Sequence, residues 1–187
     1  MRSKLYVLWF LSLVWLIGCA RNALPPKPET NTDSPQQAAV RQEFNKLKAG
    51  LAALRESKKG ADDQVWELLG PDSQAAAEKK AKVVKSAYAK LADKNKAAME
   101  KKIGLSAKEL AEMNGKTFVK SQIFQRKYDK VPNSEVSKIT VKGNTATLVF
   151  IDPGKNTVTV GLVCPEPSSQ PLVDRWKFNL EMPDEEQ

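Results

Sequence analysis

The pattern of apolar and polar positions divides this chain into three regions. Residues 5–17 are apolar throughout except for Ser12. From residue 35 to about residue 115, apolar side chains recur at spacings of three and four, which is typical of helices that bury one face. From residue 136 they alternate with polar side chains, as in strands that bury one face. The pattern therefore predicts an apolar leader, a helical region and a C-terminal sheet.

The first predicted helix begins after Ser34 and ends near Gly60. Ser34 can cap the helix, Pro35 suits its first position, and Gln37 completes a capping box. Two lysines and Gly60 form a typical end. The apolar stripe of this helix either packs on its own domain or forms a short coiled-coil seam, and packing is the preferred interpretation. The stripe consists of Val40, Phe44, Leu47, Leu51 and Leu54.

A short and a long helix are predicted next. Residues 64–71 form a short helix that ends at a Gly-Pro pair. Asp72 or Ser73 then caps an alanine- and lysine-rich helix that runs to about Lys102. One face of the long helix is apolar and lysines occupy the others. The apolar face consists of Val84, Ala87, Tyr88, Leu91, Ala98 and Met99.

The region between the long helix and the strands gives mixed signals. Ser106 and Glu109 form a second capping box, which opens a short helix expected to end at Asn114-Gly115. Residues 117–131 fit both a helical and an alternating pattern. Helix or irregular structure is the preferred interpretation there.

Four strands are predicted in the last third of the chain. Gly143-Asn144 is a typical hairpin turn between the first two. In the last strand, Trp176, Phe178, Leu180 and Met182 share the apolar face, and Asp174 marks its exposed start. Because one face of such a sheet is apolar, helices must cover it, and the predicted fold class is α+β. The strands span residues 136–142, 145–151 and 157–164, and a final stretch ending near Met182.

The leader has the features of an exported chain. Arg2 and Lys4 precede the apolar run, which is too short for a membrane span, and Gly18 precedes Cys19. Leu16-Ile17-Gly18-Cys19 resembles the lipobox of bacterial lipoproteins. This resemblance implies a diacylglyceryl thioether on Cys19, removal of residues 1–18, and acylation of the new amino terminus with a fatty acid such as palmitate. The alternative is an ordinary secretory signal with an accidental cysteine.

The residues after Cys19 predict where the domain is held. Ala20 stands where lipoproteins retained at the inner membrane carry Asp, so the resemblance implies the outer membrane, facing the periplasm, if the source has one. The following residues are polar and rich in proline, as in an extended tether. The predicted organisation is a signal peptide over residues 1–18, an anchor and tether over 19–34, and one α+β domain over 35–187.

Charge suggests a surface contact. The formal net charge is +8, and nine lysines between Lys79 and Lys102 are accompanied by only Asp93 and Glu100. This face either is simply solvated or meets anionic headgroups, an acidic wall polymer or nucleic acid. Nucleic acid is a poor partner for an exported protein without a recognition motif. The candidate polyanion contacts are Lys79, Lys80, Lys82, Lys85, Lys90 and Lys94.

The order of elements resembles the nuclear transport factor 2-like superfamily over about residues 35–182. The matching segments are Val65–Ser73, Ile139–Thr147 and Arg175–Leu180, which includes a Trp-Lys pair. The resemblance implies helices on one face of a curved sheet that forms a cone, often with an apolar pocket. Members include isomerases, dehydratases, transport subunits and binding or assembly domains, so the fold alone does not decide the function.

Few residues could perform chemistry. The chain has no histidine, which removes His-dependent nucleophiles and the usual zinc and iron ligand sets. Cys164 lies on the apolar face of a strand, where burial is a better interpretation than a reactive thiol. Isomerases of the resembling family use a pocket carboxylate and a tyrosine. The available types are Tyr88, Tyr128, Asp129 and Asp174, and none lies in a motif of that family. We predict no catalytic residue, cofactor or metal.

The expected function is that of a lipid-anchored, non-catalytic binding or assembly domain of the bacterial cell envelope. Its partner would be an envelope protein or an acidic polymer. One alternative is a pocket enzyme of the isomerase or dehydratase kind, which requires a carboxylate and a tyrosine that converge in an apolar cavity. The other is a structural contact between the lysine-rich helix and wall polymer or headgroups.

Overall fold

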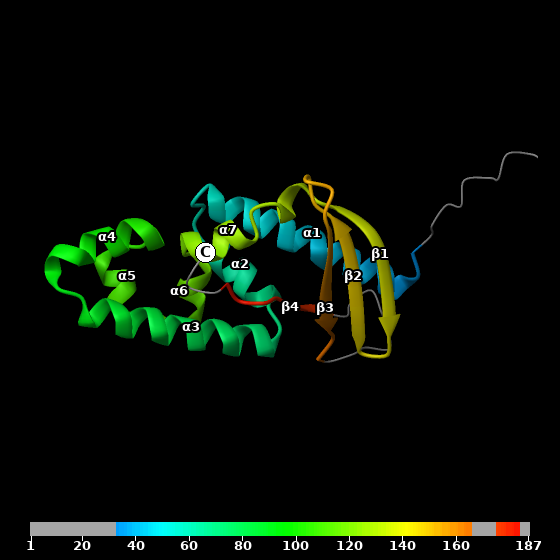
Figure 1. Cartoon of the computed structure of the whole chain (residues 1–187). Coiled ribbons are helices and arrows are strands. Elements are labelled where there is room, and N and C mark those ends of the chain that lie inside the picture. Colours follow the sequence, from blue (N-terminus) through cyan, green and yellow to red (C-terminus); the bar gives the residue numbers. More distant parts are fainter. Residues whose placement is uncertain (1–32, 166–174, 184–187) are drawn as a thin grey trace, which may run out of the picture. The chain divides into compact units, whose positions relative to one another are not determined.

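The computed structural model of the chain describes residues 33–165 and 175–183, and residues 33–187 form one compact unit. Seven α-helices, a 3-10 turn (η1) and four strands follow one another in the described residues (Figure 1). The predicted α+β class is confirmed. The predicted signal peptide, Cys19, most of the tether and Asp174 lie outside the described residues. The elements are α1 (Pro35–Arg55), α2 (Ala61–Leu68), α3 (Pro71–Lys90), α4 (Asp93–Ile103), α5 (Ala107–Ala111), α6 (Gly115–Val119), α7 (Gln122–Lys127), η1 (Val131–Asn133), β1 (Glu135–Lys142), β2 (Thr145–Ile151), β3 (Thr157–Val163) and β4 (Lys177–Asn179).

The strands form an antiparallel sheet in the order β1-β2-β3-β4. The predicted hairpin turn joins β1 to β2, and Gly143 has a φ of 60°, which glycine adopts readily. A bulge lies between Val136 and Lys138. Because the bulge adds one residue, Val136 and Ile139 both face the core although they are three positions apart.

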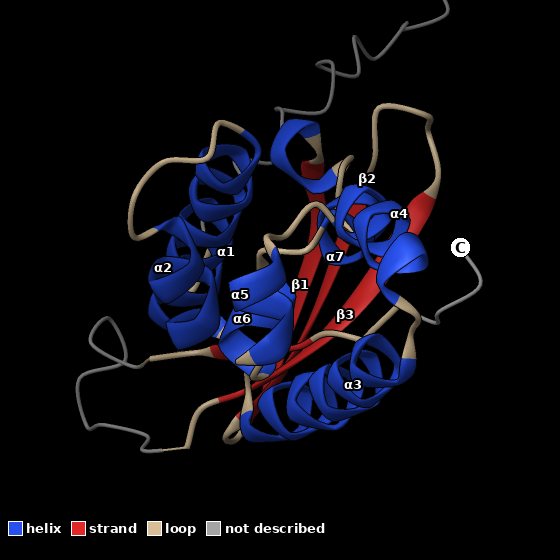
Figure 2. Cartoon of the chain, turned by 90° about the vertical axis from the view of Figure 1, so that its left-hand side faces the viewer, coloured by secondary structure: helices blue, strands red, loops and turns tan. Residues whose placement is uncertain are grey.

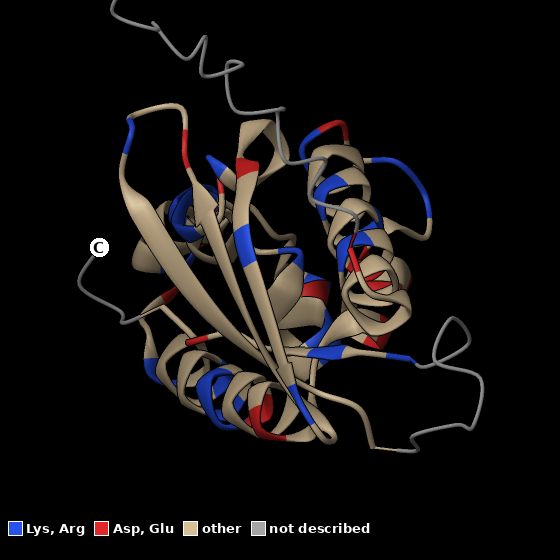
Figure 3. Ribbon diagram, turned by 90° about the vertical axis from the view of Figure 1, so that its right-hand side faces the viewer, with Lys and Arg blue, Asp and Glu red and all other residues tan. Residues whose placement is uncertain are grey.

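The helices cover one face of the sheet, and the other face carries no described element (Figures 2 and 3). The whole predicted stripe of α1 is buried in this layer, which confirms that the helix packs on its own domain. The Phe44 ring lies 5.2 Å from that of Phe150 and 6.2 Å from that of Phe178, measured between centroids. All buried apolar side chains of the described residues lie between Ala39 and Met182, so a chain that begins at Asp33 retains this core.

The predicted ends of the first helix and of the long helix are wrong. The first helix stops at Arg55, and Ser57 takes a positive φ of 53° before Gly60 begins the next turn. The predicted long helix is two helices, because Leu91 and Ala92 are extended and turn the chain back. The Tyr88 hydroxyl donates a hydrogen bond of 2.7 Å to Glu100 and so joins α3 to α4. This tertiary contact favours a break where the sequence contains neither glycine nor proline.

The prediction that Asp72 or Ser73 caps α3 is wrong. Gly70 holds the cap position, and Ser73 is 2% exposed within the core. Its hydroxyl accepts a hydrogen bond of 2.6 Å from the Leu180 N–H. The same hydroxyl lies 3.2 Å from the Phe178 carbonyl and 3.0 Å from the Leu180 carbonyl, either of which can accept its proton. Ser73 therefore fastens the start of α3 to the C-terminal segment.

These contacts also shorten the last strand. β4 pairs with β3 only from Lys177 to Asn179, whereas the prediction extended it to about Met182. The Gly70 N–H donates a hydrogen bond of 2.8 Å to the Phe178 carbonyl, so the chain leaves β3 to meet α3. The predicted apolar face is nevertheless buried at all four positions. These are Trp176, Phe178, Leu180 and Met182.

Short helices fill the region between α4 and the sheet. The capping box of Ser106 and Glu109 is confirmed, but its helix ends at Ala111 rather than at Asn114-Gly115. Asn114 instead caps α6, since its side-chain oxygen accepts a hydrogen bond from the Thr117 N–H. Residues 117–131 are mainly helical, as preferred from the sequence.

Candidate binding pocket

A pocket of about 390 Å³ opens on the helix-covered face of the sheet. It lies between α1, the segment that joins α7 to η1, and strands β2 to β4. Its walls are mainly apolar and aromatic. The apolar lining consists of Phe44, Leu47, Val131, Phe150, Val158, Val160, Phe178 and Leu180.

Strand alternation and the stripe of α1 position this lining. Phe150 pairs with Val158 across β2 and β3, so both side chains point to the same face. Phe44 lies between Phe150 and Phe178, and all three rings are buried. Val160, in contrast, is only partly buried, which leaves the β3 side of the pocket open. Packed aromatic walls with one open side are common in ligand-binding pockets.

Charged residues form the rim of the pocket. They are Arg126, Lys127, Asp129, Lys130 and Asp152. The Lys130 ammonium nitrogen lies 3.5 Å from a carboxylate oxygen of Asp152, and that of Lys127 lies 3.7 Å from a carboxylate oxygen of Glu181. Arg126 donates to the Gln122 side chain at 3.1 Å. The rim cations therefore already have partners within the domain.

Asp152 holds the loop between β2 and β3. Its carboxylate accepts hydrogen bonds from the Asn156 side chain at 2.9 and 3.2 Å, and from the Asn156 N–H at 2.9 Å. These hydrogen bonds, with a smaller contribution from Lys130, lower the pKa of Asp152. A carboxylate with a lowered pKa is a weak base at neutral pH, which does not suit proton abstraction.

Tyr128 lines the same pocket, but its hydroxyl donates a hydrogen bond to the Glu181 backbone carbonyl. Burial, and secondarily the charge of Glu181, raise the pKa of Tyr128. The hydroxyl is therefore neutral at physiological pH and is occupied by a structural contact. Asp129, the other predicted candidate here, is an exposed residue of the rim.

The remaining sequence candidates lie elsewhere. Tyr88 is buried between α3 and α4, as its place on the apolar stripe predicted. Cys164 is buried, in agreement with the prediction of a small core residue. The sequence did not predict that the apolar lining residues would come together around one pocket. The alternation of Val158 and Val160 signalled only which face of β3 is inward.

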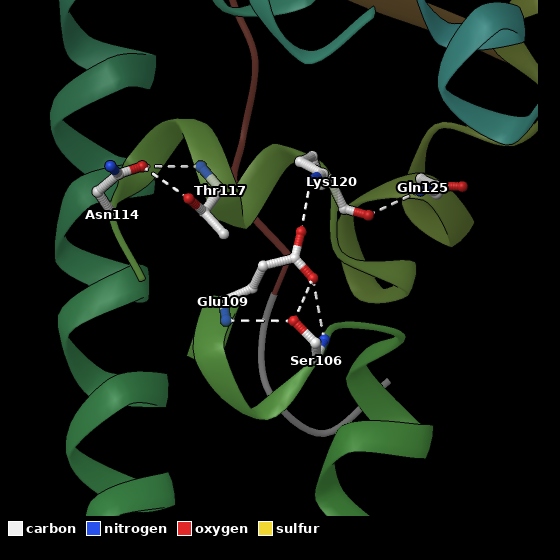
Figure 4. A network of polar contacts seen from close by, with 6 residues as sticks. All are labelled: Ser106, Glu109, Asn114, Thr117, Lys120 and Gln125. Carbon is white, nitrogen blue, oxygen red and sulfur yellow. Dashed lines mark hydrogen bonds and ion pairs between the residues drawn. The ribbon is translucent and has the colours of Figure 1, made fainter. Parts of the chain in front are cut away.

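The residue with the largest lowering of pKa lies outside this pocket, in a polar network (Figure 4). The Lys120 ammonium, then the Ser106 N–H and hydroxyl, lower the pKa of Glu109 to about 2. The Ser106 N–H donates at 3.0 Å and the hydroxyl at 2.8 Å. One carboxylate oxygen of Glu109 thus completes the capping box of α5, and the other joins α5 to Lys120 at the end of α6, so this network is structural.

We expect Glu109→Gln to flatten the acid side of the stability profile. The folded-state pKa of Glu109 is depressed, so its contribution is complete above its unfolded value of about 4.5 and is lost as the pH falls towards about 2. The variant should be less stable than the parent at pH 7, and most of the difference should be gone at about pH 2. Urea midpoints across this range measure the effect. Glu112→Gln, an exposed neighbour, is the matched control, and a parallel shift of both profiles would contradict the assignment.

Two further findings concern metals and membranes. No group of three His, Cys, Asp or Glu residues in the described part of the chain could hold a metal ion. No helix within residues 33–165 or 175–183 combines the length and the apolar character needed to cross a bilayer.

The structure is that of an α+β domain whose sheet and helices enclose an apolar pocket with a charged rim. Comparisons with protein-family models, curated proteins and solved structures gave no match. The functional argument therefore depends on the arrangement of the residues.

Proposed function

We propose that the chain is a non-catalytic binding domain of the bacterial cell envelope, anchored through lipidated Cys19, and that its pocket takes a small ligand with an apolar body. The observation that carries the proposal is the division of the pocket into an apolar aromatic lining and a charged rim. The volume of about 390 Å³ falls within the range of about 300–1,000 Å³ common for ligand sites.

The polar groups favour binding over catalysis. An isomerase-type site needs a free base and a free hydroxyl donor that converge on the substrate. Here the Asp152 carboxylate is held by Asn156, and the Tyr128 hydroxyl is bonded to a backbone carbonyl. Neither group is available for proton transfer without loss of a structural contact.

The arrangement also agrees with the resemblance to the nuclear transport factor 2-like superfamily. Helices lie on one face of the sheet, and the pocket lies between α1 and that face. A cone of this kind, with its pocket inside, is therefore part of the proposal.

Filling the pocket tests the proposal. We expect Val160→Trp to weaken binding of the neutral fluorophore N-phenyl-1-naphthylamine at least tenfold, because the new ring occupies the open β3 side of the pocket. Fluorescence titration of a chain that begins at Asp33 measures the affinity. Thr159→Trp is the matched control, since its side chain is exposed on the other face of the same strand. Equal affinities of the two variants, or no binding by the parent, would contradict the proposal.

A further inference from the structure

The outer face of α3 carries lysines that form no ion pair with a described residue. Lys79, Lys82, Lys85 and Lys90 are all exposed, and none forms an ion pair with a described residue. We call these four residues the α3 lysine face. The side of α3 that packs on the domain is formed by a separate set of buried residues. These are Ser73, Ala77, Ala81, Val84 and Tyr88.

Acidic residues are fewer than lysines on this helix. Within α3 only Asp72, at the first turn, and the half-buried Glu78 are acidic. Elsewhere in the domain partly exposed lysines have partners, such as Lys116 with Asp63 and Lys120 with Glu109. Figure 3 shows the basic segments along α3 at the lower edge of the domain. The charge of the α3 lysine face therefore remains available to an external anion.

An apolar side chain lies within the same surface. Val83 is 43% exposed and is one of two large apolar side chains exposed in the described residues. It follows Lys79 by four positions, so the side chains of Val83 and Lys79 are neighbours on the helix surface. Lysine stems with an apolar side chain next to them suit the boundary between headgroups and acyl chains. A hydrated acidic polymer would make no use of the valine.

We propose that the α3 lysine face docks on anionic lipid headgroups of a bilayer. Each lysine close to an anionic surface increases partitioning about fivefold, so four together give a substantial effect. The proposed anchor at Cys19 strengthens this contact, because tethering converts it into an intramolecular event at high effective concentration. Docking would fix which side of the domain, and thus of the pocket, faces the membrane.

A fluorescent label on the docking face tests the proposal. The full chain with Ser86→Cys carries an NBD label on the exposed side of α3, and the unsubstituted chain treated in the same way gives the blank. Both are reconstituted into vesicles of phosphatidylcholine alone or with about one third phosphatidylglycerol. We expect a blue shift and a brighter signal only with phosphatidylglycerol, and loss of both in 0.5 M NaCl because exposed charges are screened.

Replacing all four lysines of the α3 lysine face with glutamine should reduce the docked fraction of the protein more than tenfold. Glutamine is a good helix former, and circular dichroism checks that α3 is retained. Lys138→Gln with Lys142→Gln, both exposed on the outer face of the sheet, is the matched control and should keep the signal. The proposal is overturned if the NBD signal is the same with and without phosphatidylglycerol, or if the variant with four glutamines keeps it. An equal signal from soluble polyglutamate with neutral vesicles would also overturn it. Pocket binding of N-phenyl-1-naphthylamine, measured separately, is unaffected by that result.

Discussion

Phe178→Ala is expected to lower the free energy of unfolding by about 3–5 kcal/mol, the usual range for a buried aromatic side chain. Phe178 is fully buried, packs on Phe44, and lines the pocket. Its removal would leave a cavity between α1 and the sheet that the packed rings could not close. Urea unfolding of a chain that begins at Asp33, followed by circular dichroism, measures the loss.

Ile151→Ala provides the matched control for this prediction. Ile151 is a large apolar residue of the same sheet, but it is 41% exposed on the uncovered face. Its truncation should cost about 1 kcal/mol or less. A similar loss in both variants would mean that Phe178 does not hold the core together.

Ser73→Ala is expected to cost about 1–3 kcal/mol, although the substitution removes only one oxygen. The Leu180 N–H would lose its acceptor inside the core, and water could not replace the hydroxyl at a position that is 2% exposed. Thermal unfolding should show a clear drop in midpoint. Ser86→Ala, on the exposed side of the same helix, should leave the midpoint unchanged or slightly raised, because alanine favours helix. Equal midpoints for the two variants would contradict the role of Ser73.

The features that the sequence predicted well depend on local chemistry. The capping boxes at Ser34 and Ser106 and the turn at Gly143 are formed by residues within a few positions of one another. The buried stripe of α1 and the inward side chains of residues 176–182 follow from periodicity alone. For such features, neighbouring residues contain nearly all of the information.

The features that the sequence did not predict depend on distant contacts. Nothing near Leu91 breaks a helix, yet the bond between Tyr88 and Glu100 favours the turn there. Ser73 resembles a helix cap because serine is common at that position. Its actual partner, Leu180, is 107 positions away and cannot be recognised from the local sequence. The pocket likewise exists because α1 leaves the β3 side of the sheet partly open at Val160. The position at which a helix crosses a sheet cannot be predicted from a local sequence pattern.

The bonds from Gly70 and Ser73 to the C-terminal segment also set an order of events during folding. Helix α3 cannot complete its buried polar contacts until residues 178–180 have been synthesised, more than a hundred positions later. Contacts between such distant residues form late and slowly. A chain that emerges from its N-terminus therefore cannot fasten the start of α3 until its last strand is present.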